Sequence, residues 1–385
     1  MIPRVVLADD LTGACEVAGL GADRGLRAEV CLEPDSGEPA LGELRVFSTE
    51  TRLLPPAAAA AQVKAFAKAL PAGVPLFKKT DSVLRGPVAA ELAALAEVRG
   101  VSRVLLVAAN PDLHRHVVNG HYTVAGVPLH QTAFARDPHH PARTDHVGRL
   151  VGPWPGAGST VIVDPGAPLP AQGLIVGNAA SARDLATWAR AAEPGLLAAG
   201  SAAFLGALLP PARAAAPGPA PEAPDVPTLL LSGTVIPAQR ALAAQGPAVP
   251  LAREELDPTP LSRWIARVRG QLESHGTAVA FVAGEVARQP EVSQAVTDAL
   301  AALGASITAA YAGRPLHLIV EGGATAAAVA GSAGWRRLRV VRTWGGGVVT
   351  AEPGDAPSLR VTVKPGSYPW PAALRARLFP SASPA

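Results

Sequence analysis

The feature that most constrains the fold is a repeated alternation of short, apolar, β-branched runs with alanine- and leucine-rich stretches of helical length. Buried strands that alternate with helices form mostly parallel sheets that are covered on both faces. In such sheets, ligands bind beyond the carboxyl ends of the strands. The sequence therefore predicts an α/β fold with its functional residues at strand ends. The predicted strands are 4–8, 43–49, 74–80, 103–109, 228–233, 277–284, 316–323 and 358–366, and the predicted helices are 55–70, 87–98, 237–245, 259–274, 289–304 and 324–333.

A segment rich in proline and alanine, residues 210–227, interrupts this alternation. Its composition is typical of an extended, semi-rigid linker rather than of a sheet or a long helix. At roughly 150 residues per domain, a chain of 385 residues is long enough for two or three domains. We therefore expect a first domain at 1–209 and a second at 228–385, each a mostly parallel sheet flanked by helices.

Charge and composition argue against several classes of protein. The net charge is only +3 and the basic residues are dispersed, whereas a nucleic-acid surface clusters them. The two cysteines form neither a CxxC pair nor a disulfide framework. No apolar run reaches the ~18 residues that span a bilayer, and the N-terminal run is too short for a signal peptide. We expect a cytoplasmic protein that binds a small molecule rather than nucleic acid or membrane; a homodimer is left open.

The motif LADDLTGACEVAG (7–19) places two adjacent carboxylates, Asp9 and Asp10, between a predicted strand and a helical stretch. An acid pair at a strand end can bind a cation, or can accept a proton from a substrate hydroxyl. Asp10 or Thr12 could instead serve only as the cap of the helix. Because one cap needs a single acid, the pair favours a functional site.

A second cluster of polar residues lies in FKKTDSVLRGPVAAEL (77–92), at a strand-to-helix turn. Arginine grips a carboxylate or phosphate bidentately and lysine acts as a point charge, so this turn suits an anionic substrate. The alternative is a polar loop in which Asp81 caps the helix, but lysine occurs only five times in the chain. Arg52, in STETR (48–52), also follows a strand and could point into the same crevice. The turn contains Lys78, Lys79, Asp81, Ser82 and Arg85.

Seven of the nine histidines fall between residues 110 and 146. Their spacing matches neither an HExxH motif nor a paired Cys/His zinc site, so we assign no metal ligands. The dipeptides NG (119–120) and DP (137–138) are typical of turns. We interpret the region as polar loops in which one or two histidines contact substrate.

The second half of the chain has several glycine-rich strand ends. Glycine lets the backbone approach an anion closely, and the N-terminus of a following helix offers N–H groups and a favourable dipole. Neither GxGxxG after a strand nor GxxxxGK[ST] is present, which excludes the standard dinucleotide fingerprint and the P-loop. The glycine loops are in LLLSGTVIPAQRAL (229–242), LIVEGGATAAAVAG (318–331), TWGGGVVT (343–350) and VKPGSYPWP (363–371).

Together these motifs resemble those of the four-carbon acid sugar kinase family, whose members phosphorylate tetronates such as threonate, erythronate and 3-oxo-tetronate with ATP. The resemblance implies an N-terminal domain that binds the acid sugar, a C-terminal domain that binds the nucleotide, and an active site in the cleft between them. The motifs that carry it occur in the family's order and are ADDLTGA (8–14), KKTDSVLRG (78–86), an NG-to-DP stretch (119–138), SGT with Gln239 (232–239), GGATA (322–326) and KPGS (364–367).

The resemblance also implies roles for single residues. Asp9 and Asp10 are implied as catalytic, and either could be the base for the attacking hydroxyl. Mg²⁺ that bridges the phosphates of ATP is implied by phosphoryl transfer. The implied substrate contacts are Arg52, Lys78, Lys79, Thr80, Asp81, Ser82 and Arg85. The implied nucleotide contacts are Ser232, Gly233, Gly322, Gly323, Ala324, Thr325, Ala326 and Gly366.

Two departures from the family pattern motivate an alternative function. Ala324 stands where the family usually has an acidic residue, and KPGSYPWP replaces the usual KSGGFG ending, so that Pro365 removes one backbone donor. The alternative is a catalytically impaired member that binds or senses a sugar acid. A metal-dependent phosphatase built on Asp9 and Asp10 is disfavoured, because their spacing is not the DxDxT of that chemistry.

Overall fold

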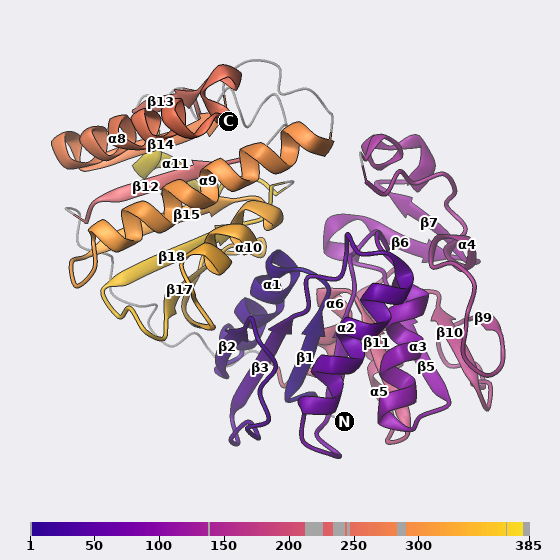
Figure 1. Cartoon of the computed structure of the whole chain (residues 1–385). Helices are drawn as coiled ribbons and strands as arrows, with labels where there is room; N and C mark the ends of the chain where they lie inside the picture. The colour runs from indigo at the N-terminus through magenta and orange to yellow at the C-terminus, as the bar shows by residue number, and fades with distance from the viewer. Residues whose placement is uncertain are drawn as a thin grey trace. The chain divides into compact units, whose positions relative to one another are not determined.

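The computed structural model describes residues 2–137, 139–211, 226–233, 243–244, 247–282, 290–366 and 368–379. The chain divides into two compact units, Met1–Ala214 and Ala215–Ala385, here called the first and second domains (Figure 1). Most of the predicted linker 210–227 and most of the predicted helix 237–245 lie outside the described residues. The domain boundaries and the position of the active site between the domains therefore stay predictions.

A sheet of parallel strands forms the centre of the first domain. Its order is β2-β3-β1-β4-β11-β5-β10-β9, and every pairing between neighbours is parallel. The predicted strands at 4–8, 43–49, 74–80 and 103–109 are confirmed as β1, β3, β4 and β5. The strand bounds are β1 Val5–Ala8, β2 Arg27–Cys31, β3 Glu43–Ser48, β4 Leu76–Lys79, β5 Arg103–Val107, β9 Thr160–Val163, β10 Gly173–Gly177 and β11 Leu196–Gly200.

Helices flank this sheet (Figure 1). Helices α2 and α3 pack against each other, and α6 packs against α1 and α5. The predicted helices at 55–70 and 87–98 are confirmed as α2 and α3. The bounds are α1 Leu11–Ala22, α2 Pro56–Ala69, α3 Val88–Arg99, α4 Val147–Leu150, α5 Ala182–Ala191 and α6 Ala202–Leu208, with 3₁₀ turns η1 Pro111–Leu113, η2 Leu129–Gln131 and η3 Ala133–Arg136.

The histidine-rich region contains a small antiparallel sheet, so its interpretation as polar loops alone is wrong. Strands β6 (Arg115–Val118), β7 (His121–Val124) and β8 (Val127–Pro128) pair in that order. Asn119 and Gly120, the predicted NG turn, join β6 to β7 with φ angles of 50° and 76°. Positive φ at both central residues is the geometry of a two-residue type I′ hairpin.

The second domain has a mixed sheet in the order β13-β14-β12-β15-β18-β17-β16. The first five strands are parallel, and β17 pairs antiparallel with both β18 and β16. The four predicted strands are confirmed as β12, β14, β15 and β18, and three predicted helices as α8, α9 and α10. The bounds are β12 Thr228–Ser232, β13 Ala248–Leu251, β14 Thr277–Val282, β15 Leu316–Glu321, β16 Arg337–Thr343, β17 Val349–Pro353, β18 Leu359–Lys364, η4 Arg253–Leu256, α8 Pro258–His275, α9 Pro290–Ala310, α10 Gly323–Ser332 and α11 Ala372–Leu378.

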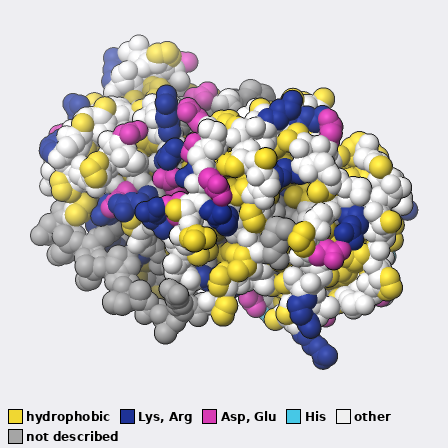
Figure 2. All heavy atoms as spheres, turned by 90° about the horizontal axis from the view of Figure 1, so that it is seen from below, with side chains coloured by type: hydrophobic (Ala, Val, Ile, Leu, Met, Phe, Trp, Pro, Cys, Tyr) yellow, Lys and Arg dark blue, Asp and Glu magenta, His cyan; other side chains and the backbone are white. Residues whose placement is uncertain are grey.

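Basic and acidic side chains are interspersed over the face of the molecule shown in Figure 2. This mixing agrees with the dispersed charge of the sequence. Within the described residues, every helix is too short or too polar to cross a bilayer.

Candidate functional site

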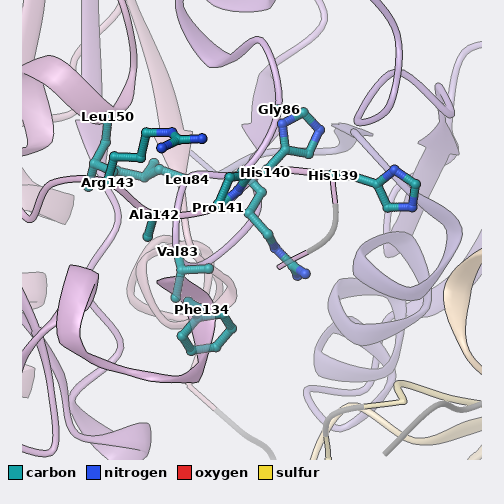
Figure 3. Close-up of a pocket in the computed structure, with 11 residues that line it drawn as sticks. Val83, Leu84, Gly86, Phe134, His139, His140, Pro141, Ala142, Arg143 and Leu150 are labelled. Carbon is teal, nitrogen blue, oxygen red and sulfur yellow. The ribbon is translucent and has the colours of Figure 1, made fainter. Parts of the chain in front are cut away.

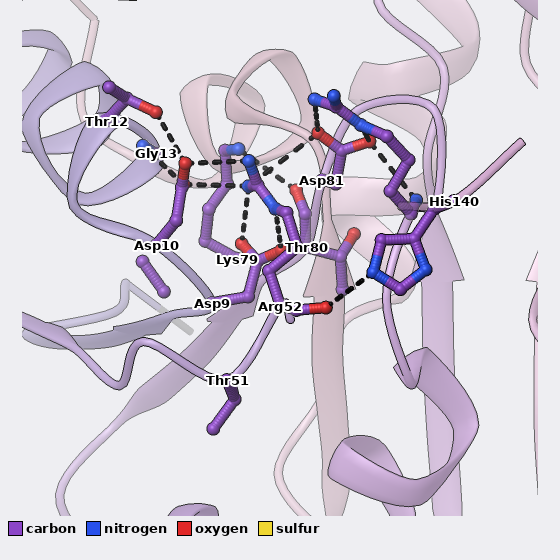
Figure 4. Close-up of polar contacts among 12 residues, drawn as sticks. Asp9, Asp10, Thr12, Gly13, Thr51, Arg52, Lys79, Thr80, Asp81 and His140 are labelled. Carbon is purple, nitrogen blue, oxygen red and sulfur yellow. Dashed lines mark hydrogen bonds and ion pairs between the residues drawn. The ribbon is translucent and has the colours of Figure 1, made fainter. Parts of the chain in front are cut away.

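Three neighbouring strands, β3, β1 and β4, end at one edge of the first domain's sheet. Asp9 and Asp10 follow β1 directly, Arg52 follows β3 after a short turn, and Asp81 follows β4. Since the strands are parallel and adjacent, these three segments of the sequence meet at their carboxyl ends. Figure 4 shows the resulting cluster, with Arg52 between the carboxylates and Lys79 beside them.

Arg52 binds both aspartates at once. Its Nε and Nη2 donate to the two oxygens of Asp9 at 2.8 and 3.1 Å. Its Nη1 and Nη2 donate to the two oxygens of Asp10 at 2.6 and 2.7 Å. Nη2 also lies 3.6 Å from Oδ1 of Asp81. One guanidinium therefore holds two carboxylates in bidentate geometry, the strongest form of this contact.

The cations of this cluster favour the ionised forms of Asp9 and Asp81. Burial alone would raise the pKa of Asp9, but Arg52, Lys78 and Lys79 lower it below its ordinary value. Burial likewise opposes ionisation of Asp81, yet nearby arginines hold its pKa well below the usual range. The carboxylates in turn raise the pKa of Arg52 well above its ordinary value, despite the burial of that side chain.

Asp10 also caps helix α1. Its Oδ1 accepts a hydrogen bond from the backbone N–H of Gly13 at 2.8 Å, and its Oδ2 accepts one from Thr12 Oγ1 at 2.5 Å. A Cβ on Gly13 would lie 2.7 Å from Asp10 Oδ1, so the first turn of the helix requires glycine there. Asp10 therefore serves as the helix cap, and a catalytic role for the same side chain stays a prediction.

Asp81 fixes the turn after β4 and does not cap α3, which begins at Val88. Its Oδ2 accepts from the backbone N–H groups of Val83 and Arg85 at 3.1 and 3.2 Å. The guanidinium of Arg85 donates to both Asp81 oxygens at 3.0 and 2.7 Å and to Asp137 at 3.0 Å. Asp81 thus sets the path of the loop and the direction of Arg85.

Lys78 and Lys79 have different surroundings, because adjacent residues of a strand point to opposite faces of the sheet. Lys79 Nζ lies 3.2 Å from Oε2 of Glu16 on α1, close to the aspartates. Lys78 has a fully buried side chain, and its Nζ lies 2.8 Å from Oε2 of Glu91 on α3. Its burial and the ion pair with Glu91 favour a structural role for Lys78, and contact between Lys78 and the substrate stays a prediction.

We expect Lys78→Met to lower the free energy of unfolding by about 3 kcal/mol, because Glu91 is then buried without its partner. The double variant Lys78→Met/Glu91→Leu removes both charges and is expected to recover most of that loss. Urea unfolding measures both effects. Calorimetry with a sugar acid provides the second readout: we expect the double variant to bind like the wild type, and weaker binding would show that Lys78 contacts the ligand.

Residues of the hairpin region complete the cluster, and the sequence patterns did not single them out as site residues. Arg115 at the start of β6 donates to Oγ of Ser82, and Tyr122 of β7 donates to the Ser82 carbonyl. The guanidinium carbons of Arg115 and Arg85 lie 5.6 and 5.9 Å from the centre of the Phe134 ring. The NG dipeptide was the available signal: it predicts a hairpin, and the first strand of that hairpin carries Arg115 to the turn after β4.

A cavity of about 360 Å³ adjoins the turn after β4 (Figure 3). Its walls include Arg85, Phe134, His140 and Arg143. The Nε2 atom of His140 lies 2.8 Å from the carbonyl oxygen of Arg52, which joins this wall to the carboxylate cluster. Contact between a histidine and the substrate stays a prediction. In the described part of the chain, no group of three or more His, Cys, Asp or Glu side chains has the arrangement of a metal site.

The second domain brings most of its predicted site residues together at the ends of β12, β15 and β18, which are neighbours in the sheet. A Cβ on Gly233 would lie 2.5 Å from Oγ1 of Thr325, and one on Gly366 would lie 3.8 Å from Cα of Gly322. Ser232 and Thr325 are buried and Ala324 is exposed. Ala326 is 3% exposed, and its backbone N–H donates to the Gly322 carbonyl at 3.0 Å.

A buried ion pair that the sequence patterns did not reveal lies beneath these loops. The Nζ atom of Lys364 donates to Oε1 of Glu321 at 2.8 Å, and Oε2 of Glu321 accepts from Ser232 Oγ at 2.7 Å. Burial lowers the pKa of Lys364, although Glu321 opposes that shift. The rarity of lysine identified Lys364 as unusual, but nothing in the sequence identified its partner.

Comparison with known proteins identifies the family of the first domain and relatives of the chain. The family of the sugar-binding N-terminal domain matches residues 4–208, more than half of the 385-residue chain. A D-threonate kinase of Salmonella typhimurium is 32% identical over 151 residues, which cover 38% of this chain and 36% of that protein. A D-erythronate kinase of Heliobacterium modesticaldum is 35% identical over 153 residues, covering 38% and 35%. The aligned segments therefore span little more than a third of these relatives.

The fold is shared over a greater length than the sequence. A solved structure from Salmonella typhimurium LT2 matches with a TM-score of 0.78 and 18% identity, and covers 98% of this chain and 99% of that one. The chain belongs to the family of the sugar-binding N-terminal domain, and it is similar over part of its length to proteins named as kinases of four-carbon sugar acids.

Proposed function

We propose that this protein is an ATP-dependent kinase that phosphorylates a hydroxyl group of a four-carbon sugar acid of the threonate, erythronate or 3-oxo-tetronate type. One observation carries the proposal: Arg52 holds the carboxylates of Asp9 and Asp10 together at a strand end, in a chain similar to proteins named D-threonate kinase and D-erythronate kinase. We place the reaction in cytoplasmic carbohydrate metabolism.

The substrate has a carboxylate and several hydroxyl groups, and the turn after β4 offers partners for both. Lys79 and Arg85 supply the positive charge that a carboxylate requires. Thr80 is 1% exposed, and among the described residues its Oγ1 has no hydrogen-bond partner. A hydroxyl of this kind can donate to or accept from a substrate hydroxyl. Asp81 and Ser82 complete the proposed substrate contacts.

The attacking hydroxyl must lose a proton as the phosphoryl group arrives. The lowered pKa of Asp9 keeps its carboxylate ionised at neutral pH, which makes it an acceptor for that hydroxyl. Phosphoryl transfer depends mainly on positioning and on charge neutralisation, so a weak base in the correct place suffices. Asp9 and Asp10 both fit this role, and Asp10 is the more exposed of the two, at 8% against 2%.

The strand ends of the second domain fit the phosphates of a nucleotide. Helix α10 begins at Gly323, and its N-cap Gly322 has φ 104° and no side-chain cap among the described contacts. The N–H groups of the first turn are therefore suited to bind an anion. Bound there, ATP would supply the phosphoryl group, and Mg²⁺ on its phosphates would neutralise part of their charge. The proposed nucleotide contacts are Ser232, Gly233, Gly322, Gly323, Ala324, Thr325, Ala326 and Gly366.

Formation of ADP from ATP·Mg with a panel of tetronates tests the proposal. We expect turnover with at least one four-carbon sugar acid and none with the corresponding neutral alditol. Absence of ADP across a broad panel, with enzyme at substrate concentration, would contradict it. Calorimetry with ATP·Mg then separates the alternative, a sugar-acid binding protein without turnover, which predicts tetronate binding without nucleotide binding.

A further inference from the structure

The last residues of three adjacent strands in the second domain form one buried polar row. In the register of the sheet, Ser232 of β12 stands opposite Glu321 of β15, and Glu321 stands opposite Lys364 of β18. Glu321 and Lys364 are 0% exposed and Ser232 is 2% exposed. Their side chains are joined by hydrogen bonds of 2.7 and 2.8 Å through the two oxygens of Glu321.

Each member of this row directly precedes one of the glycine loops. Gly233 follows Ser232, Gly322 follows Glu321, and Gly366 follows Lys364 after one proline. The row also bonds to the loops themselves: Lys364 Nζ donates to the Pro365 carbonyl at 3.0 Å, and the N–H of Gly322 donates to the Lys364 carbonyl at 2.9 Å. The side chains that join the strands therefore also fix where the loops begin.

The ammonium of Lys364 is enclosed rather than directed at a ligand. Glu321, the Pro365 carbonyl and the ring of Trp370, whose centre lies 5.0 Å from Nζ, surround it. A buried ion pair adds little stability compared with apolar residues of similar volume, so the contacts that this pair makes with the loop backbone carry the argument for its role. Its charges neutralise each other, which leaves backbone N–H groups and the N-terminus of α10 to meet the phosphates.

We propose that Ser232, Glu321 and Lys364 are positioning residues of the nucleotide site: they hold the three glycine loops in the spacing that fits the phosphate groups of ATP. This inference rests on the proposed function. The loops pack closely, since a Cβ on Gly233 would lie 2.5 Å from Thr325 Oγ1, so a small displacement of one strand end changes the site. Glu321 and Lys364 act through the loop backbone and do not touch the nucleotide, whereas Ser232 is also one of the proposed nucleotide contacts.

Calorimetry with ATP·Mg on the full-length chain tests this. We expect Lys364→Met to weaken ATP binding at least ten-fold and Ser232→Ala to weaken it about three-fold. Because Lys364→Met leaves a buried carboxylate unpaired and can unfold the domain, the deciding variant is Lys364→Met/Glu321→Leu, which removes both charges. We expect this double variant to fold and still to bind ATP at least ten-fold more weakly, with an increased KM for ATP and an unchanged KM for the tetronate.

The matched control is Lys78→Met/Glu91→Leu, which removes the buried Lys–Glu pair of the other domain. It is expected to bind ATP like the wild type. If Lys364→Met/Glu321→Leu also binds ATP with wild-type affinity, the row has only a structural role and the inference is wrong, while the proposed function stands. If the wild type itself binds no ATP, the proposed function is wrong, and the inference, which rests on it, is wrong as well.

Discussion

Replacing Asp10 by asparagine is expected to lower kcat for tetronate phosphorylation by about 100-fold to 10,000-fold, the range typical for loss of a positioned general base. Asparagine has the shape of aspartate but cannot accept the proton of the attacking hydroxyl. The KM for ATP is expected to stay unchanged, because Asp10 belongs to the first domain's cluster. Steady-state kinetics with an ADP-coupled assay measures the loss.

The fold should survive this change. Asparagine is as good a helix N-cap as aspartate, so the bond from Gly13 N–H to the side chain of residue 10 can persist. The variant weakens the Arg52–Asp10 pair, but Arg52 keeps Asp9 and Asp81 nearby, so we expect the unfolding free energy to fall by less than the loss of about 3 kcal/mol for a fully broken buried ion pair. Asp9→Asn is the matched comparison: because Asp9 is less exposed than Asp10 and cations lower its pKa, which weakens it as a base, we expect a smaller loss of kcat. A larger loss in Asp9→Asn would assign the base to Asp9.

The position of the site at the carboxyl ends of the strands was predictable, because it follows from the alternation of strands and helices along the chain. Asp9 and Asp81 directly follow the predicted strands 4–8 and 74–80, and Arg52 lies shortly after the predicted strand 43–49. Parallel neighbouring strands bring such residues together. Strand β11 was not predictable in this way. Its sequence, Leu-Leu-Ala-Ala-Gly, has no β-branched residue, and only its burial in the middle of the sheet makes it a strand.

The sequence could not predict which charged side chains pair with each other. Lys78 and Lys79 are adjacent and chemically identical, yet one is buried against Glu91 and the other lies beside Glu16. The strand's alternation predicts that they face opposite ways, but not which face holds the site. Glu321 likewise reads as the polar end of an apolar strand until the register places it opposite Lys364.

Removal of the Arg52 guanidinium is expected to have the largest effect on stability. In Arg52→Met, Asp9 and Asp10 lose their bidentate partner and Asp81 loses a nearby cation. The Arg52 side chain is only 15% exposed and that of Asp9 only 3%, so solvent compensates little. Breaking a buried charge pair typically destabilises by 3 to 5 kcal/mol, and we expect a loss of about 5 kcal/mol at pH 7.5, measured by urea unfolding.

The loss of unfolding free energy in Arg52→Met should depend on pH, and the titration of the buried carboxylates determines whether it grows or shrinks. In the wild type the pKa values of Asp9 and Asp81 are lowered, so their contribution to stability is present above pH ~4 and is lost as the pH falls further. Without Arg52, only Lys78 and Lys79 oppose the effect of burial on Asp9, so its pKa is lowered less than in the wild type and protonation on acidification costs the variant less. The difference in unfolding free energy between wild type and Arg52→Met should therefore shrink between pH 7.5 and pH 4.5.

The control is Arg103→Met, which breaks the more exposed Arg103–Glu193 pair and should change the unfolding free energy by no more than about 1 kcal/mol. A difference between wild type and Arg52→Met that stays constant over this pH range would show that Arg52 stabilises the domain by packing rather than by charge.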